Sequence, residues 1–314
     1  MAGFTDYFLQ QEYTKVAQLG NKLGKIRDIV DWERFRPIVS VMYHDNKETG
    51  GRPHTDEILM IKMLILGAMY GLSDYELELL AMDRMSFRHF LNYPEKIPDR
   101  STIWKFREDV TELGFHRIWE ELQRQIEEKG FAIKRGTIQD ASIIAADPGH
   151  VAADKTRGDD SKTRRSRDGT WTMKGNKSAF GYKVHIIVDK ENQFIREFDT
   201  TTASVHDSQI DLSQKGQTVY RDKGYFGTTP FASMDKTMKR AVRGKPLAEK
   251  DKRRNRAISR IRSRVERPFA VIKRVFHGGH VMVTTHLRVG VKNFFSCFSY
   301  NLFNLVTRTN ASYR

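Results

Sequence analysis

Three acidic residues, Asp140, Asp222 and Glu266, could carry out metal-dependent chemistry, because each lies within or at the end of an expected strand or helix. Three carboxylates that meet repel one another unless cations lie between them, and hard oxygen ligands favour Mg²⁺ or Mn²⁺. Two such ions about 3.5–4 Å apart can activate a water or a 3′-hydroxyl and stabilise the leaving oxygen of a phosphodiester. The three acids therefore predict in-line displacement at phosphorus with no covalent protein nucleophile.

Each acid also has a simpler interpretation. Asp140 could be a turn residue at the end of a strand, and Asp222 could close an Asx turn before Gly224. Glu266 could form an ion pair with Arg262, one helical turn earlier, on a solvated face. The chemistry therefore depends on elements that bring the three acids together.

The elements that would position Asp140 and Asp222 are predicted strands. Residues 136–146 are rich in β-branched and apolar side chains and place Asp140 in the middle of a strand or towards its end. Asp222 follows a short strand directly, and a helix is predicted between the two acids at residues 208–215. The other predicted strands span residues 180–189, 194–201, 218–221 and 238–243.

Glu266 lies on a predicted helix at residues 255–276, where apolar residues recur at spacings of three and four. The carboxylate lies beside this apolar stripe and is surrounded by arginines and lysines. Pro268 removes a backbone donor and disfavours helical geometry at Arg267, so we expect a kink or a short break just after Glu266. The stripe that should face the core comprises Ile258, Ile261, Val265, Phe269, Ile272 and Phe276.

The order of these elements predicts the fold class. Three strands, of which the last two form a hairpin, precede a helix, a strand that ends in an acid, a further strand and a long helix that carries an acid. This is the chain order of an RNase H-like α/β domain with a mixed five-stranded sheet, predicted for residues 135–314. A closing helix is expected at residues 289–306.

Residues 1–134 are predicted to form an all-α domain for DNA binding and assembly. We expect Thr55 to cap a helix over residues 56–70, and Ser73 with Glu76 to form the capping box of the next helix. Ser101 is expected to cap a longer helix that ends near Gly130.

The helix after Ser101 places Lys105 and Arg107 close to its N-terminus, where they could contact a DNA groove or phosphates. In the alternative interpretation, Trp104 and Phe106 belong to the core and the charges are solvated. A second basic segment, residues 155–177, has Trp171 as its only aromatic residue and is predicted to be a mobile loop or arm.

The composition favours a polyanionic partner. The 314 residues have a formal net charge of +15, and 39% are hydrophobic, which is ordinary for a globular protein. The longest apolar run, residues 58–69, contains Lys62 and is shorter than the roughly 20 residues that span a bilayer. A single cysteine, Cys297, excludes an intrachain disulfide. We therefore expect a cytoplasmic, nucleoid-associated protein without a membrane partner.

Many short motifs, in order, resemble the DDE-class insertion-sequence transposases of bacteria and archaea, insertion-sequence family five, which is related to family four. Those in the first half are Gly51-Arg52-Pro53, Leu72-Ser73-Asp74, Asp83-Arg84, Ser86-Phe87-Arg88 and Pro98-Asp99-Arg100-Ser101-Thr102. Those in the second half are Asp140-Ala141-Ser142, Asp168-Gly169-Thr170-Trp171, Phe180-Gly181-Tyr182-Lys183, Asp222-Lys223-Gly224-Tyr225 and Arg264-Val265-Glu266-Arg267-Pro268-Phe269.

The resemblance implies that Asp140, Asp222 and Glu266 are the DDE triad and hold two Mg²⁺ or Mn²⁺ ions. The family signature around the glutamate has a tyrosine, an arginine and a lysine at set spacings. Arg262 and Lys273 match it, whereas Ser259 occupies the tyrosine position. The residues expected to contact DNA are Arg262, Lys273, Trp171, Lys174, Lys183, Arg264, Lys105 and Arg107.

The implied activity is that of a transposase that binds terminal inverted repeats, cleaves the element ends and transfers the 3′-hydroxyl strands to target DNA. Joining two ends implies a homodimer on double-stranded DNA. Two alternatives use the same features: an RNase H-like nuclease without strand transfer, and a DNA-binding derivative that has lost catalysis.

Overall fold

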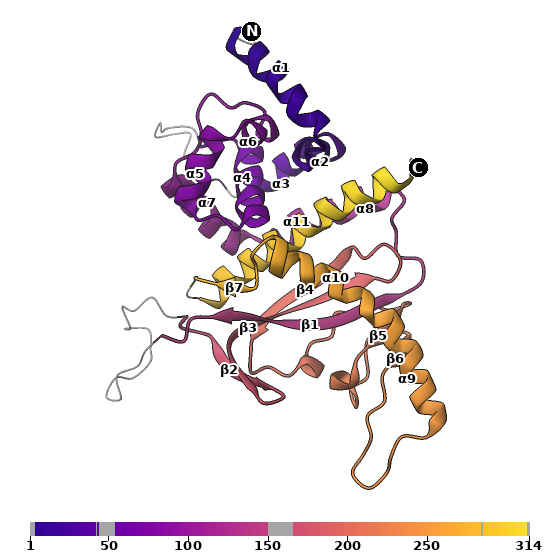
Figure 1. The fold of residues 1–314 in the computed structure, drawn as a ribbon. Helices are drawn as coiled ribbons and strands as arrows, with labels where there is room; N and C mark the ends of the chain where they lie inside the picture. Colours follow the sequence, from indigo (N-terminus) through magenta and orange to yellow (C-terminus); the bar gives the residue numbers. More distant parts are fainter. Residues whose placement is uncertain (1–3, 42, 44–53, 150–165, 284, 313–314) are drawn as a thin grey trace, which may run out of the picture. The chain divides into compact units, whose positions relative to one another are not determined.

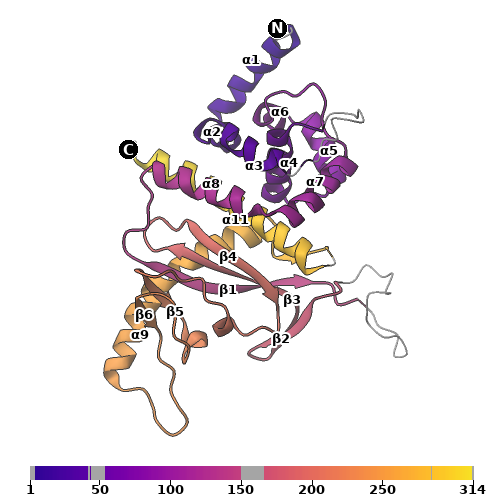
Figure 2. The same cartoon turned by 180° about the vertical axis from the view of Figure 1, so that it is seen from behind.

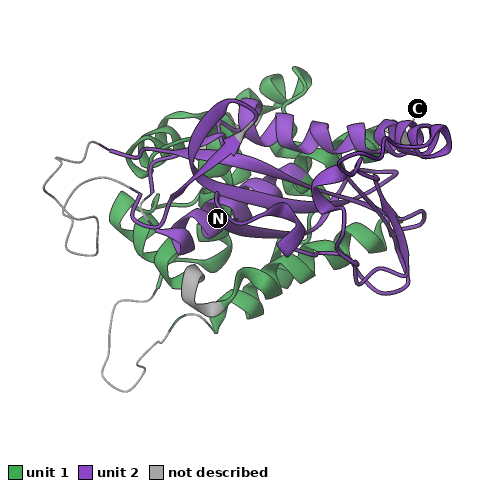
Figure 3. Cartoon of the chain, turned by 90° about the horizontal axis from the view of Figure 1, so that it is seen from below, with its two compact units in different colours: residues 1–130, 301–314 green, residues 131–300 purple. Residues whose placement is uncertain are grey.

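The computed structural model describes residues 4–41, 43, 54–149, 166–283 and 285–312. The chain forms two compact units, which Figure 3 shows in different colours. One unit contains residues 1–130 and 301–314, and the other contains residues 131–300. The Gly51-Arg52-Pro53 motif lies outside the described residues.

The first unit is helical, as predicted. A 3₁₀ turn, η1 (Trp32–Phe35), connects its second and third helices, and the last turns of α11 (His286–Ser312) also belong to it. Its other helices are α1 (Phe4–Gln18), α2 (Lys22–Ile29), α3 (Arg36–Ser40), α4 (Glu57–Tyr70), α5 (Asp74–Asp83), α6 (Met85–Phe90), α7 (Arg100–Leu113) and α8 (Phe115–Glu128).

The helix caps confirm one prediction and correct two. Ser73 and Glu76 form the expected capping box of α5. The caps predicted at Thr55 and Ser101 are wrong, because neighbouring aspartates take these roles. Asp56 accepts the backbone N–H of Leu59 at the start of α4, and Asp99 accepts that of Thr102 at the start of α7. In each case two suitable cap residues lie close together, and the point where the backbone turns into the helix selects the aspartate.

The alternative interpretation of helix α7, in which Trp104 and Phe106 are core residues and the charges are solvated, is confirmed only in part. Phe106 is buried, but Trp104 is 49% exposed and Lys105 is exposed. Arg107 donates from Nη1 to Oδ2 of Asp74 on α5 at 3.0 Å, so it joins two helices within the unit.

Helix α4 carries a lysine in the core of the first unit. The Lys62 side chain is 1% exposed, and Nζ lies 4.9 Å from the ring centroid of Trp32 and 5.4 Å from that of Phe90. Burial lowers the pKa of Lys62 to about 8, because the charged form loses its hydration.

No single helix in the described part of the chain is long and apolar enough to cross a membrane. Helices α4 and α5 together have the length and composition of a membrane span, but the chain bends by 105° between them.

The second unit contains a mixed sheet with helices, which confirms the predicted RNase H-like α/β class (Figures 1 and 2). The central strand order is β4–β3–β1–β5–β6, with β1 antiparallel to β3 and parallel to β5. Two more strands, β2 and β7, pair with β3 and β1, so the described residues form seven strands rather than five. The strands are β1 (Thr137–Ala146), β2 (Thr170–Lys174), β3 (Lys177–Asp189), β4 (Ile195–Thr202), β5 (Thr218–Arg221), β6 (Met234–Thr237) and β7 (His280–Val281).

Two predicted elements are wrong. Residues 208–215 form no α-helix beyond a 3₁₀ turn, η2 (Asp207–Gln209). The Gln139 side chain instead binds the backbone of Ile210 and Leu212, which holds this segment beside β1. The predicted strand at 238–243 is replaced by β6, which pairs with β5 and ends where β5 ends.

The basic segment predicted as an arm contains a strand. Residues 155–165 lie outside the described residues. Beyond them, β2 pairs with β3 from Thr170↔Gly181 to Lys174↔Lys177, so Trp171 lies on the sheet. The prediction of a loop is therefore wrong for residues 170–174, whose alternating side chains suit an edge strand.

The predicted helix that carries Glu266 is longer and more irregular than expected. It comprises α9 (Glu249–Arg262), a 3₁₀ turn η4 (Ser263–Val265), α10 (Glu266–Ala270) and a π-helical turn η5 (Val271–Val275). The predicted stripe is buried except for half-buried Ile261. The irregularity begins before Glu266, not after it, because Pro268 lies in the first turn of α10, where its missing N–H has no helical partner to lose.

The closing helix is confirmed as α11, and its first part packs on β4. Asn293 donates to Oγ1 of Thr200 at 2.9 Å, and the ring centroid of Phe294 lies 6.1 Å from that of Phe198. These contacts cover one face of the sheet.

We predict that Lys62→Met raises the free energy of unfolding by about 1 kcal/mol, because it removes a buried charge and keeps the length of the side chain. Urea unfolding at pH 7 measures the change. Lys25→Met, at an exposed position of α2, is the control and should change stability by less than about 0.5 kcal/mol. A loss of stability in Lys62→Met would mean that the contacts with the Trp32 and Phe90 rings outweigh the cost of burial.

Candidate active site

The parallel pairing of β1 with β5 brings Asp140 and Asp222 to equivalent positions on neighbouring strands. Ile138 is paired with Tyr220, and each acid lies two residues further along its chain. Residues two apart point to the same face of a sheet, and neighbouring strands are about 4.8 Å apart. The two carboxylates therefore arise side by side where the strands separate.

Gly136 permits the close approach of these strands. Its φ is +92°, and a Cβ at this position would lie 2.6 Å from the backbone oxygen of Thr218, the first residue of β5. Both the positive φ and the lack of space exclude a larger side chain. Glycine at this position thus helps to set the register that aligns Asp140 with Asp222.

Glu266 reaches the same neighbourhood from the helical side. Arg262 Nη2 donates to Asp140 Oδ2 at 2.7 Å, which joins the end of α9 to β1. Glu266 follows one helical turn later, as the first residue of α10, and is exposed. The ion pair suggested between Glu266 and Arg262 is not the one that forms, since the guanidinium contacts Asp140.

The pKa of Asp140 is affected by the nearby carboxylates of Asp222 and Glu266. Burial, together with smaller contributions from the charges of Asp222 and Glu266, raises the pKa of Asp140 to about 6, although Arg262 and the N–H of Ala141 act to lower it. The charged form is therefore disfavoured in the folded protein despite its ion pair. The two other carboxylates lie near enough to contribute to this shift.

The carboxylates also make local hydrogen bonds. Asp140 Oδ1 accepts the N–H of Ala141 at 2.9 Å, and Asp222 Oδ1 accepts the N–H of Gly224 at 2.6 Å. The Asx turn considered for Asp222 is thus present. It occupies one oxygen of Asp222, and no donor contacts Oδ2 among the described residues.

The donor set suits a hard divalent cation in its chemistry, because it consists of carboxylate oxygens whose mutual repulsion a cation would relieve. Within the described part of the chain, no three His, Cys, Asp or Glu side chains are arranged to hold a metal. Both oxygens of Asp140 accept hydrogen bonds, so a cation would have to displace one of the donors. Asp140, Asp222 and Glu266 are the residues that could provide its ligands.

The basic residues predicted to contact DNA differ in their exposure and in the contacts that they make within the protein. Lys183 forms an ion pair with Asp207 at 2.8 Å, and its side chain is only 12% exposed. Lys273 is half-buried and donates to the backbone oxygen of Ile143 on β1 at 2.6 Å. Arg264 is exposed and donates to the oxygen of Lys190 at 2.8 Å. Of these three, only Arg264 is exposed.

Trp171 is 51% exposed on β2, and its ring centroid lies 5.3 Å from that of Phe180. The backbone of Lys174 ends this strand, but its side chain lies outside the described residues. A cavity of about 130 Å³ is lined by residues of β2 and by residues of β1 that follow Asp140. It is lined by Ala141, Ser142, Ile143, Thr172, Met173, Lys183 and Asp207.

The predicted site residues do not include Tyr225, which is fully buried beside the acids. Burial raises its pKa, and the charges of Asp140, Asp207 and Asp222 add to this effect. The phenol therefore stays neutral and forms part of the wall behind the carboxylates. Its place directly after Asp222-Lys223-Gly224 was the available sequence signal.

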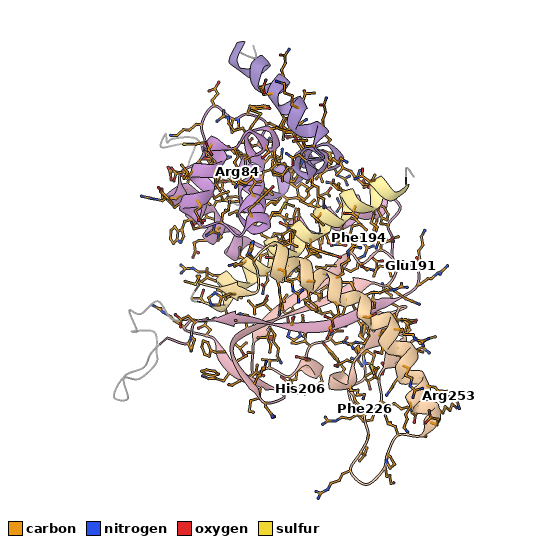
Figure 4. All side chains as sticks on the ribbon, viewed as in Figure 1. Arg84, Glu191, Phe194, His206, Phe226 and Arg253 are labelled. Carbon is orange, nitrogen blue, oxygen red and sulfur yellow. The ribbon has the colours of Figure 1, made fainter. Side chains whose placement is uncertain are left out.

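A second feature absent from the predicted site residues is a basic surface around α9, which we call the α9 surface. Its cations are exposed, and none forms an ion pair with a carboxylate of the described residues. Figure 4 shows one of them, Arg253, extending away from the helix. The α9 surface comprises Arg240, Arg243, Lys245, Lys250, Arg253, Arg256 and Arg260.

We predict that Asp140→Asn stabilises the metal-free protein, and that the gain grows as pH rises. The pKa of Asp140 is about 6 in the folded protein and close to 4 when unfolded, so the folded state loses stability as pH rises through this interval. The gain of Asp140→Asn over wild type should reach about 1–3 kcal/mol above pH 7. Urea unfolding in EDTA between pH 4 and pH 8 tests this; a gain independent of pH would contradict it.

Comparison with protein families agrees with this arrangement. The family described as Transposase DDE domain matches residues 135–302, the part of the chain that contains all three acids. The family described as Transposase domain (DUF772) matches residues 11–109. No solved structure matches the chain. Because the first match covers more than half of the chain, the protein belongs to the DDE transposase family.

Proposed function

We propose that this DNA transposase binds the terminal inverted repeats of an insertion sequence, cleaves the element ends and joins the 3′-hydroxyl strands to target DNA. The observation that carries the proposal is the matching position of Asp140, on β1, and Asp222, directly after the parallel strand β5, with Glu266 one helical turn from the arginine that contacts Asp140. These acids would hold two Mg²⁺ or Mn²⁺ ions. When bound, the ions would activate a water or a 3′-hydroxyl and stabilise the leaving oxygen.

The residues of the chain would hold and orient the scissile phosphate. Asp140 is largely buried, with its side chain 16% exposed, so water has limited access to this carboxylate and charges act strongly there. Arg262 and Lys273 both contact β1, at the Asp140 carboxylate and at the backbone oxygen of Ile143, and their charges are suited to phosphate oxygens. No protein side chain needs to form a covalent intermediate.

DNA binding is supported by charge. The α9 surface presents seven exposed cations without carboxylate partners among the described residues, and Arg264 continues it towards the acids. Phosphates neutralise such a surface and release counterions. Trp171 is suited to stacking on an unpaired base, and Lys105 to phosphate contact by the helical unit. Arg107 and Lys183 would first have to leave their aspartate partners, and Lys174 stays a prediction.

The assembly follows from the reaction. Two element ends must be joined to one target, and one set of three acids acts on one strand at a time. We therefore propose that the protein acts as a homodimer on double-stranded DNA, in a cytoplasmic, nucleoid-associated setting.

We predict that Asp140→Asn, Asp222→Asn and Glu266→Gln each reduce cleavage and strand joining at least about 100-fold, because each removes a charged ligand, while DNA affinity is retained. The assay uses a labelled duplex with the flanking inverted repeat, Mg²⁺, and a pre-cut end with a free 3′-hydroxyl. Glu249→Gln, on α9, is the matched control and should remain active.

The outcomes separate the proposal from its rivals. A variant that retains activity would remove that acid from the site. Wild-type cleavage without joining of the pre-cut end would indicate a nuclease. Wild-type binding without cleavage would indicate a DNA-binding derivative that has lost catalysis.

We predict that the triple substitution Arg253→Gln, Arg256→Gln and Arg260→Gln makes DNA binding less dependent on salt. The negative slope of log K, the DNA association constant, against log salt concentration should become smaller in magnitude by up to about 3, because each lost phosphate contact contributes roughly 0.9. Fluorescence anisotropy with a duplex at several salt concentrations measures the slope. The control carries three substitutions at exposed cations elsewhere, Arg117→Gln, Lys129→Gln and Lys134→Gln. An equal fall in both variants would mean that only net charge matters.

A further inference from the structure

The ion pair between Arg262 and Asp140 is largely buried and lies at the candidate metal site. Both side chains are only 16% exposed, and the guanidinium donates from Nη2 to Asp140 Oδ2 at 2.7 Å. The pair therefore places a positive charge against one of three neighbouring carboxylates. A metal ion held through Oδ2 of Asp140 would have to compete with this guanidinium.

The Arg262 guanidinium is also incompletely satisfied. Its Nε is buried and has no hydrogen-bond acceptor among the described residues. A buried donor without a partner costs about 1–3 kcal/mol, and buried guanidinium groups with a permanent structural role usually have their donors paired. The position seen here is thus electrostatically favourable for Asp140 but unfavourable for the arginine.

From these observations we propose that Arg262 is an internal counter-ion that occupies the cation position at Asp140 in the metal-free protein and leaves this carboxylate when a divalent ion binds. The inference rests on the proposed function, since it assumes that Asp140 is a metal ligand. It goes beyond that function by giving Arg262 a role before DNA is bound.

The charges around Asp140 explain why such an exchange is favourable. The groups that face it are the carboxylates of Asp222 and Glu266, the guanidinium and the N–H of Ala141. One positive charge balances three carboxylates only in part, whereas a divalent ion balances them better. Once the ion is bound, a guanidinium at the same oxygen is repelled, and a DNA phosphate offers it a stronger partner.

The exchange couples metal binding to DNA binding. Without DNA, the metal must displace Arg262, which lowers its apparent affinity. With DNA, the phosphate accepts the displaced guanidinium, so each ligand should strengthen the binding of the other by the same factor. The protein would thereby bind its metal ions most tightly on its substrate.

Mn²⁺ binding to the full chain without DNA tests this inference, with free Mn²⁺ followed by electron paramagnetic resonance at pH 8, where Asp140 is ionised. We expect Arg262→Gln to bind Mn²⁺ roughly three- to fivefold more tightly than wild type, the upper part of the range for the loss of a competing, partly exposed ion pair. Arg264→Gln removes the same charge two residues away without touching Asp140 and should change the affinity less than about twofold.

Equal tightening in Arg262→Gln and Arg264→Gln would overturn the inference, because only net charge would then matter. Weaker or unchanged binding in Arg262→Gln would also overturn it, since the arginine would then position Asp140 or have no effect. If no variant binds Mn²⁺ at all, Arg262 is not what excludes the ion, and the inference fails.

Asp140→Asn distinguishes this failure from failure of the proposed function. If wild type and Asp140→Asn bind Mn²⁺ equally, the metal site itself is wrong. If Asp140→Asn abolishes binding but Arg262→Gln does not tighten it, the site stands and only the counter-ion role is lost. A second readout is the Nε–H signal of Arg262 in ¹⁵N-labelled protein, which should shift during a Mg²⁺ titration and saturate with the binding curve.

Discussion

The parallel pairing of β1 and β5 is the constraint on which the rest of the candidate site depends. Two residues after Ile138↔Tyr220, the strands separate and leave Asp140 and Asp222 at matching positions. The long strand β1 has β3 on its other side, so its orientation is held by pairing on both edges. A shift of one residue in β5 would turn Asp222 to the opposite face and separate the acids.

The site is assembled against electrostatic repulsion. Burial and two neighbouring carboxylates raise the pKa of Asp140 to about 6, and its ion pair with Arg262 offsets this only in part. Packing elsewhere must supply the compensating stability. The apolar stripe of α9, α10 and the two irregular turns provides it by burying residues such as Val265 and Phe269 beside Glu266. Apolar packing of this helical segment thus offsets the repulsion among the three carboxylates.

The basic residues divide into two groups that composition alone does not separate. Some are engaged within the fold, as Lys183 is with Asp207 and Arg107 with Asp74. Others, such as Arg253 on the α9 surface, are exposed without carboxylate partners among the described residues and are available to phosphates. The net charge of +15 therefore does not show which cations can contact DNA, whereas the clustering of exposed cations around α9 does.

The sequence by itself determined the elements with strong local signals: the strands that carry Asp140 and precede Asp222, the helical first unit and the periodic apolar stripe beside Glu266. Hydrophobic periodicity and side-chain type decide these over a few residues. Only the tertiary structure decided that residues 210–212 form no helix, because Gln139 from a distant strand binds their backbone. It also decided that Arg262 pairs with Asp140 rather than Glu266. Both contacts join residues far apart in the chain, and local spacing carries no information about which long-range partner prevails.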